Sequence, residues 1–382
     1  MSTDFDVGAF GGRAGAGISL ASLFCGLILL GNVGWGQDRV MLRGGSGIGA
    51  IFEQGRVIDW TGSELQLEAE GGAVRKIDAS QVESVDTVRL EAHVAGMRHL
   101  AEGKPEEAKQ ALLKALAEEP RVWMRREILA ELVRVDLALG DRGGAATHFL
   151  AIHTSDPNTM WWNHVPLDWG LEPPSSADAS LARNWMRPAE SQVAQLIGAS
   201  ILLFDPGESV LAQERLKRLA VSTDRRVYSL ARAQQWRMRL QGGRVSEGEV
   251  KIWLDRLEEI PEPLRGGAHF LIGHGYASAA KPERAAMHWL WLPLVYDEDP
   301  RLAAKAEVLA ANQLRQIGRA GDAIVLYREV IERFGYTPSR AIAEKALAEF
   351  TTTTEDRSAV SPKQPVPSGD GPSTPVDPKG EE

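Results

Sequence analysis

The chain has 382 residues, of which 43% are hydrophobic and 25% are charged, and its formal net charge is −9. This length allows two domains or one long repeat array, and the composition is that of a folded globular protein. The negative charge argues against a general nucleic-acid binder, which needs a basic surface. Because Cys25 is the single cysteine, we expect neither an intramolecular disulfide nor a cysteine-based zinc site.

The N-terminal segment contains an apolar run from Ile18 to Val33, which follows Arg13 and precedes the small residues Gly34 and Gly36. The run is short for a membrane span and suits the hydrophobic region of a signal peptide. We therefore expect residues 1–36 to be a signal peptide, and the chain to be exported to the periplasm or cell envelope. An uncleaved anchor, which would associate with the membrane, and a buried core helix are the alternatives.

Residues 37–88 have a different pattern from the rest of the chain. Apolar residues alternate with polar ones at Val40 and Leu42 and again at Leu65 and Leu67, and pairs of glycine and serine residues separate these runs. Alternation with glycine-rich turns is typical of short β-strands. The pattern resembles the small SH3-like or Sm-like β-barrel modules that precede the repeats of exported bacterial proteins. The glycine-rich stretch at 44–49 is expected to be a turn, because no Lys-Ser/Thr pair follows it as in a phosphate-binding loop.

From residue 89 to residue 350, apolar positions recur at steps of three and four, which predicts helices. A pattern of one small residue, four others and alanine repeats along this region. Its final residues are Ala108, Ala145, Ala212, Ala285 and Ala323, with a degenerate copy that ends at Val250. The steps between successive endpoints are 37, 67, 38, 35 and 38 residues. A period near this length indicates stacked pairs of helices.

The first copy carries the sharpest motif. Gly96 precedes Ala108 by twelve residues, and Leu112, Ala115 and Pro120 follow it. This spacing resembles the tetratricopeptide repeat. Small residues allow the two helices to cross closely, Leu112 fills the groove between them, and Pro120 stops the second helix.

The later copies match this pattern at fewer positions. The residues expected to play the same structural roles are Ala145, Phe149, Ala285, Trp289, Ala323, Tyr327 and Val330. The resemblance implies a mostly α-helical fold, an α-solenoid of TPR-like helix pairs behind the β module. Each repeat would contact only its neighbours, and the concave groove would hold an extended peptide or a partner's helix.

The double step contains an insertion at 158–177 that is rich in aromatic residues. Trp161, Trp162, His164 and Trp169 lie within it. Packing across a junction between repeats is the favoured role. Binding to a partner's peptide or to a sugar ring is the alternative, and it makes these four the candidate partner-binding residues.

Catalytic chemistry has little support in the sequence. His148 and His153, like His269 and His274, are five residues apart, which places the members of each pair about 140° apart on a helix. Neither pair has metal-ligand spacing, and no serine or cysteine has a recognisable catalytic setting. We therefore predict no metal, cofactor or catalytic residue, although an enzyme without a known motif remains a third hypothesis.

Residues 351–382 are rich in proline, serine and threonine and are expected to be disordered, either as a tether or as a dispensable end. Together, these features predict a non-catalytic scaffold or adaptor in the bacterial cell envelope. It would bind an unidentified protein partner and no nucleic acid. The alternative is a glycan- or cell-wall-binding module that uses the tryptophan-rich insertion.

Overall fold

The computed structural model describes residues 37–43 and 51–359. The expected signal peptide and the glycine-rich turn at 44–49 lie outside the described residues, as does the end of the tail. The start of the tail differs from the prediction, because the last helix continues past residue 351 to Ala359. The first proline of the tail is Pro362, so no residue before it forbids helical backbone.

An antiparallel sheet forms the N-terminal module. Its strands are β1 (Asp38–Leu42), β2 (Ile51–Trp60), β3 (Glu64–Glu68), β4 (Val74–Asp78) and β5 (Val82–Asp86), and the 3₁₀ helix η1 (Ala79–Gln81) joins the last two. The strand order is β4-β3-β2-β1-β5. The long strand β2 pairs with β1 through its first half and with β3 through its second half. The expectation of a closed β-barrel is therefore wrong, because β4 and β5 are the two edges of an open sheet.

Helices cover the apolar face of this sheet. Val40, Val57 and Leu65 are buried in one cluster with Leu112 and Ile128 from the first helices. Because α-helices remove this face from water, the strands do not need to close on themselves to bury it. This packing is the physical reason for the open sheet.

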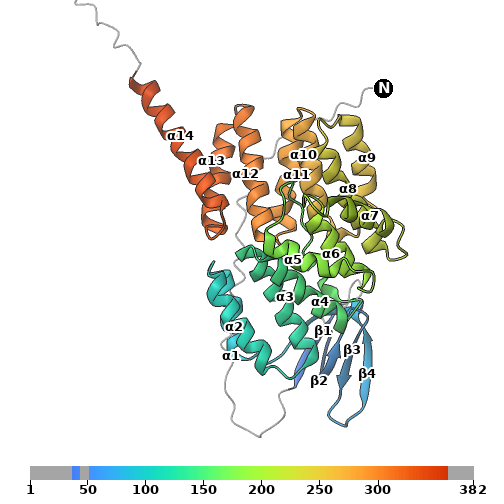
Figure 1. The fold of residues 1–382 in the computed structure, drawn as a ribbon. Helices are drawn as coiled ribbons and strands as arrows, with labels where there is room; N and C mark the ends of the chain where they lie inside the picture. Colours follow the sequence, from blue (N-terminus) through green and yellow to red (C-terminus); the bar gives the residue numbers. More distant parts are fainter. Residues whose placement is uncertain (1–36, 44–50, 360–382) are drawn as a thin grey trace, which may run out of the picture.

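Helical hairpins make up the rest of the described chain (Figure 1). The helices are α1 (Glu91–Ala101), α2 (Pro105–Glu118), α3 (Val122–Leu139), α4 (Arg142–Ser155), α5 (Ser176–Trp185), α6 (Gln192–Leu202), α7 (Ser209–Leu219), α8 (Arg225–Gln241), α9 (Glu247–Leu257), α10 (Gly266–Ser278), α11 (Pro282–Val295), α12 (Pro300–Gln316), α13 (Ala320–Arg333) and α14 (Ser339–Ala359). Two further 3₁₀ helices are η2 (Met160–His164) and η3 (Glu262–Leu264).

The endpoints of the sequence repeat lie near the start of the second helix in successive hairpins. They fall on α2, α4, α7, α9, α11 and α13, and all are fully buried. The double step between Ala145 and Ala212 contains a long loop and the additional helix α5. The residues assigned structural roles by the repeat are likewise buried, except Pro120, which is exposed just after α2.

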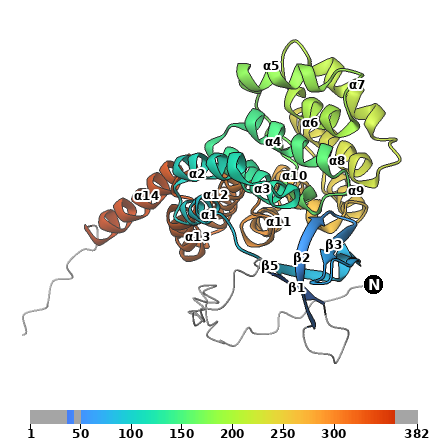
Figure 2. The ribbon, with the colours of Figure 1, turned by 90° about the horizontal axis from the view of Figure 1, so that it is seen from below.

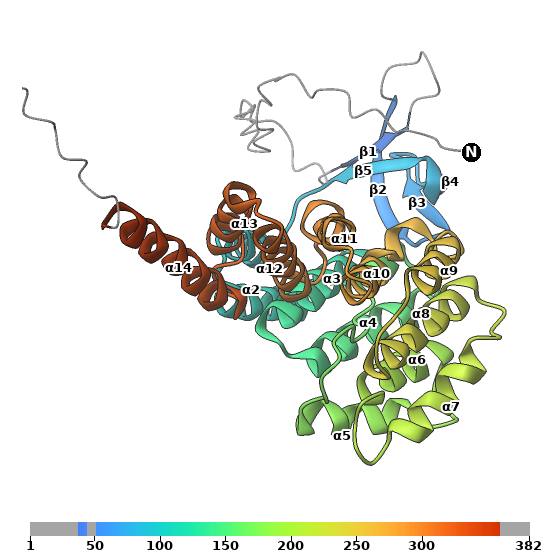
Figure 3. The same cartoon turned by 90° about the horizontal axis from the view of Figure 1, so that it is seen from above.

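The two ends of the helical region meet, which differs from an array in which each repeat contacts only its neighbours. Helix α3 packs against α12, and the two lie side by side in Figures 2 and 3. The Arg301 guanidinium on α12 lies against Gly140, which ends α3 in the left-handed conformation at φ +81°. The guanidinium can lie there only because glycine has no side chain, since a Cβ at position 140 would overlap it. Helix α14, by contrast, projects away from the rest of the fold (Figure 1).

Candidate functional site

The tryptophan-rich insertion forms a loop at residues 156–175, between α4 and α5, which we call the Trp loop. It begins against the sheet, where Asp156 accepts a hydrogen bond of 2.8 Å from the backbone N–H of Gly62 in the β2–β3 turn. It then forms η2 and crosses toward the later helices. The loop is therefore fixed at one end to the N-terminal module.

Two of its tryptophans are almost completely buried. The ring of Trp162 packs edge-on against Phe149 and His153, and the Arg226 guanidinium lies over it at 4.2 Å. Trp169 occupies the space beside Gly267 on α10, where no side chain would fit. Exposures of 5% for Trp162 and 7% for Trp169 leave little ring surface for a ligand.

Trp161 and His164 complete the set of predicted partner-binding residues. Trp161 is partly exposed and packs edge-on against His164, which is buried. The structure thus brings the four aromatic residues into one packed segment. Their predicted role in binding a partner stays a prediction, and it would require the loop to open.

A buried ion pair fastens the second half of the Trp loop. The fully buried Arg237 on α8 donates to Asp168 Oδ2 at 2.9 Å, and to the carbonyl oxygens of Gly170 and Ser200 at 2.7 and 2.6 Å. Burial alone would raise the pKa of Asp168, but the positive charges of Arg237 and Arg142 outweigh it and lower that pKa. Charged groups inside a protein need this degree of pairing.

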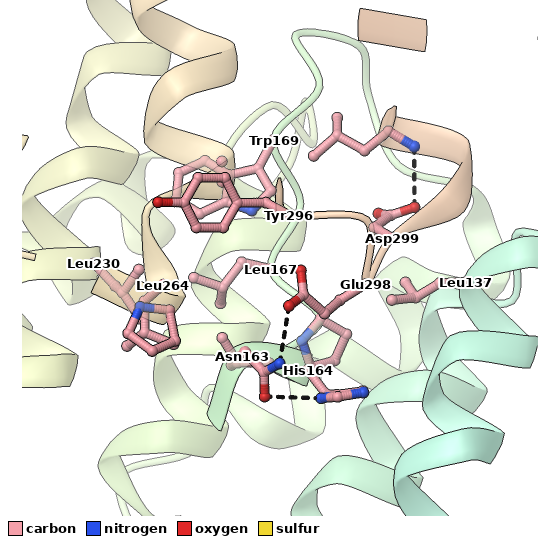
Figure 4. Close-up of a pocket in the computed structure, with 16 residues that line it drawn as sticks. Leu137, Asn163, His164, Leu167, Trp169, Leu230, Leu264, Tyr296, Glu298 and Asp299 are labelled. Atoms are coloured by element: carbon pink, nitrogen blue, oxygen red, sulfur yellow. Dashed lines mark hydrogen bonds between the residues drawn. The ribbon is translucent and has the colours of Figure 1, made fainter. Parts of the chain in front are cut away.

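A narrow cleft with about 510 Å³ of space not filled by atoms lies beside the loop. Trp169 and Tyr296 form its walls, and Asn163 joins Glu298 to His164 by two hydrogen bonds of 2.9 Å (Figure 4). Burial lowers the pKa of His164 to about 3 and raises the pKa of Glu298. The imidazole is therefore neutral at pH 7, and its Nδ1 is already engaged.

A larger groove lies where the two ends of the helical region meet, and we call it the α12 groove. It has about 950 Å³ of space not filled by atoms. Its walls come from α3, the start of α4, the Trp loop, α12 and the start of α14, through residues that include Leu137, Arg142, Arg301, Leu302, Lys305 and Ile342. Ile342 is 53% exposed, so the groove presents apolar as well as charged side chains to solvent.

Sequence reasoning did not find this groove. Its residues come from four separate segments, and no spacing along the chain connects them. The one signal available was Gly140, whose position after α3 marks a helix end, but glycine there does not reveal that Arg301 lies against it.

A second feature that the sequence did not reveal is a buried pair of histidines. His269 on α10 and His288 on α11 lie with their Nδ1 atoms 3.0 Å apart. Burial lowers the pKa of His269 to about 3 and that of His288 to about 4, so both are neutral at pH 7. A hydrogen bond between the two Nδ1 atoms requires one imidazole to donate and the other to accept.

The described ranges contain no cluster of three or more histidine, cysteine, aspartate or glutamate side chains able to hold a metal ion. Among the same residues, no helix has the length and apolar character needed to cross a membrane. Comparisons of the chain with protein-family models, with curated proteins and with solved structures found no match.

Proposed function

We propose that the protein is a non-catalytic interaction scaffold or adaptor that holds a peptide or helix of a partner protein. The α12 groove is the observation that supports this proposal. It is open to solvent, and both apolar and charged residues line its walls. Grooves between helices bind partner segments through a few apolar anchors and flanking polar contacts.

The location we propose is the bacterial cell envelope, after export directed by residues 1–36. We further infer that the helical hairpins are repeats of the tetratricopeptide type, since the Gly96–Ala108–Leu112 spacing supports this assignment. The small β module would then fix the first hairpins and the start of the Trp loop.

A crosslinked pull-down tests the proposal. A C-terminally tagged full-length chain would be recovered from the envelope fraction, and its N-terminus would be sequenced. We expect one stoichiometric protein partner and an N-terminus near Gln37. Recovery of the chain from the cytosol with an intact Met1 would contradict export, and the absence of any partner would contradict the scaffold.

A further inference from the structure

The charged side chains of the α12 groove are almost all paired within the chain. Its lining contains the cations Arg142, Arg301 and Lys305 and the carboxylates Asp168 and Glu172. Arg142 lies 3.4 Å from Asp299, and Lys305 Nζ lies 3.1 Å from Glu172. Asp168 is bound by Arg237. One positive charge, that of Arg301, remains without a counter-ion in the described part of the chain.

Arg301 is held in place although it has no acidic partner. Asp299, two residues earlier, caps α12 by accepting hydrogen bonds of 3.1 Å from the backbone N–H groups of Arg301 and Leu302. The guanidinium then lies against Gly140, at the carboxyl end of α3. A cation is favourable at that end of a helix, which explains the position of the group. Among the described residues, the guanidinium makes no ion pair.

An apolar surface shares the groove with this cation. Ile342 on α14 is exposed, and Leu302 and Pro338 line the same groove. An arginine that is partly removed from water, beside apolar side chains, favours a carboxylate ligand, because the planar guanidinium donates two parallel hydrogen bonds to it.

We propose that the α12 groove binds a partner segment in which an aspartate or glutamate stands beside an apolar residue. Arg301 pairs with the carboxylate, and the apolar side chain packs on Ile342. This inference rests on the proposed scaffold function and specifies the chemistry of the partner. Charge complementarity selects it, because the groove has one unpaired positive charge and no unpaired negative one.

Peptide selection tests the inference directly. Random 12-residue peptides displayed on phage would be selected against the folded full-length chain, and the enriched peptides would be labelled with fluorescein for measurement of Kd by anisotropy. We expect a consensus that contains an acidic residue next to an apolar one. Arg301→Glu should weaken binding at least tenfold, whereas Arg328→Glu, an exposed charge reversal on α13 outside the groove, should leave Kd unchanged.

Substitutions at Ile342 test the effect of charge on peptide binding with little risk of unfolding the chain, because this side chain is exposed. Ile342→Asp should weaken binding of the same peptides, and Ile342→Lys should weaken it far less or strengthen it. Circular dichroism checks that each variant is folded, and if Arg301→Glu is not, the Ile342 pair decides.

The outcomes distinguish the two proposals. Enriched peptides without an acidic consensus, or with equal Kd for Ile342→Asp and Ile342→Lys, would overturn the inference and leave the scaffold function standing. Failure to enrich any peptide would count against the scaffold function itself, and the inference would fall with it.

Discussion

The α1–α2 hairpin and the Trp loop bury their side chains through different kinds of contact. In the hairpin, Gly96 faces Leu112, and a Cβ at Gly96 would lie 2.5 Å from the Leu112 Cγ atom. In the Trp loop, Trp169 packs beside Gly267 of α10, and Asp168 is bound by Arg237 of α8.

The difference determines what a sequence can reveal. Contacts within one hairpin join residues at a fixed spacing, so they leave a periodic signal. Contacts between distant segments have no fixed spacing. The sequence therefore does not distinguish a residue that packs in such a contact from one that binds a ligand. Substitutions in the two regions can test whether the loop depends on distant contacts as strongly as the hairpin depends on near ones.

The largest effect is expected at Arg237. Arg237→Ala removes the partner of buried Asp168 and leaves the Gly170 and Ser200 carbonyls without their donor. We expect the free energy of unfolding to fall by about 3–5 kcal/mol, measured by urea denaturation. Arg319→Ala, which removes an exposed pair with Asp322, should change it by less than about 1 kcal/mol. Equal effects would show that the loop does not depend on its buried ion pair.

Trp162 provides the next test, and it also addresses the glycan-binding alternative. Because the ring is buried, Trp162→Ala should lower the free energy of unfolding by about 3 kcal/mol through the cavity it leaves. The partly exposed Trp161 is the matched control, and its alanine variant should lose clearly less. A Trp162→Ala chain with unchanged stability and lost binding to purified wall polysaccharide would instead favour the glycan-binding role.

Acid should weaken the Trp loop through His164. The pKa of His164 is about 3 in the folded chain and 6.5 as an ordinary value, so the unfolded chain binds more protons between these limits. The contribution of neutral His164 to the free energy of unfolding is fully present above pH 6.5 and is lost as the pH falls. At pH 5 the free energy of unfolding is lower by about 2 kcal/mol for this reason.

His164→Gln, which cannot be protonated, should flatten the pH dependence by that amount. Denaturation curves of both chains at pH 7 and pH 5 measure it. An unchanged slope in the variant would mean that His164 is not buried as the structure places it.

The smallest expected effects compare two glycines directly. Gly267→Ala forces a methyl group against the Trp169 ring, which other residues hold in place, and should cost about 2 kcal/mol. Gly96→Ala meets the flexible side chain of Leu112, and the higher helix propensity of alanine offsets part of the cost, which leaves a loss of about 1 kcal/mol. Thermal unfolding measures both variants. A larger loss of stability for Gly96→Ala than for Gly267→Ala would contradict the proposed difference between the hairpin and the Trp loop.

The helical region could be predicted from its periodicity because each hairpin buries its own small residues, as Ala108 and Ala323 show. The insertion at 158–177 could be predicted from the double step, and α5 begins at its end, but the period did not show that an additional helix precedes the next repeat. The open sheet was missed for a related reason. Alternation at Leu65 and Leu67 predicts strands, but the helices that cover them decide whether a barrel closes.

The candidate site was less accessible to prediction. Arg301 is one of many arginines in the sequence, and what sets it apart is its place in the α12 groove, against Gly140. This placement arises when α3 and α12 meet. The Trp loop is unusual in composition and is therefore visible in the sequence. The α12 groove has an ordinary composition and is visible only in the fold.

Site-specific photo-crosslinking would test the central claim most directly. A photoreactive phenylalanine analogue would replace Ile342 in the α12 groove or Val210 on α7, which is 75% exposed, in cells that express the full-length chain. We expect a discrete crosslinked protein partner from position 342 and none from position 210. The same adducts from both positions, or none from position 342, would contradict a partner held in the α12 groove.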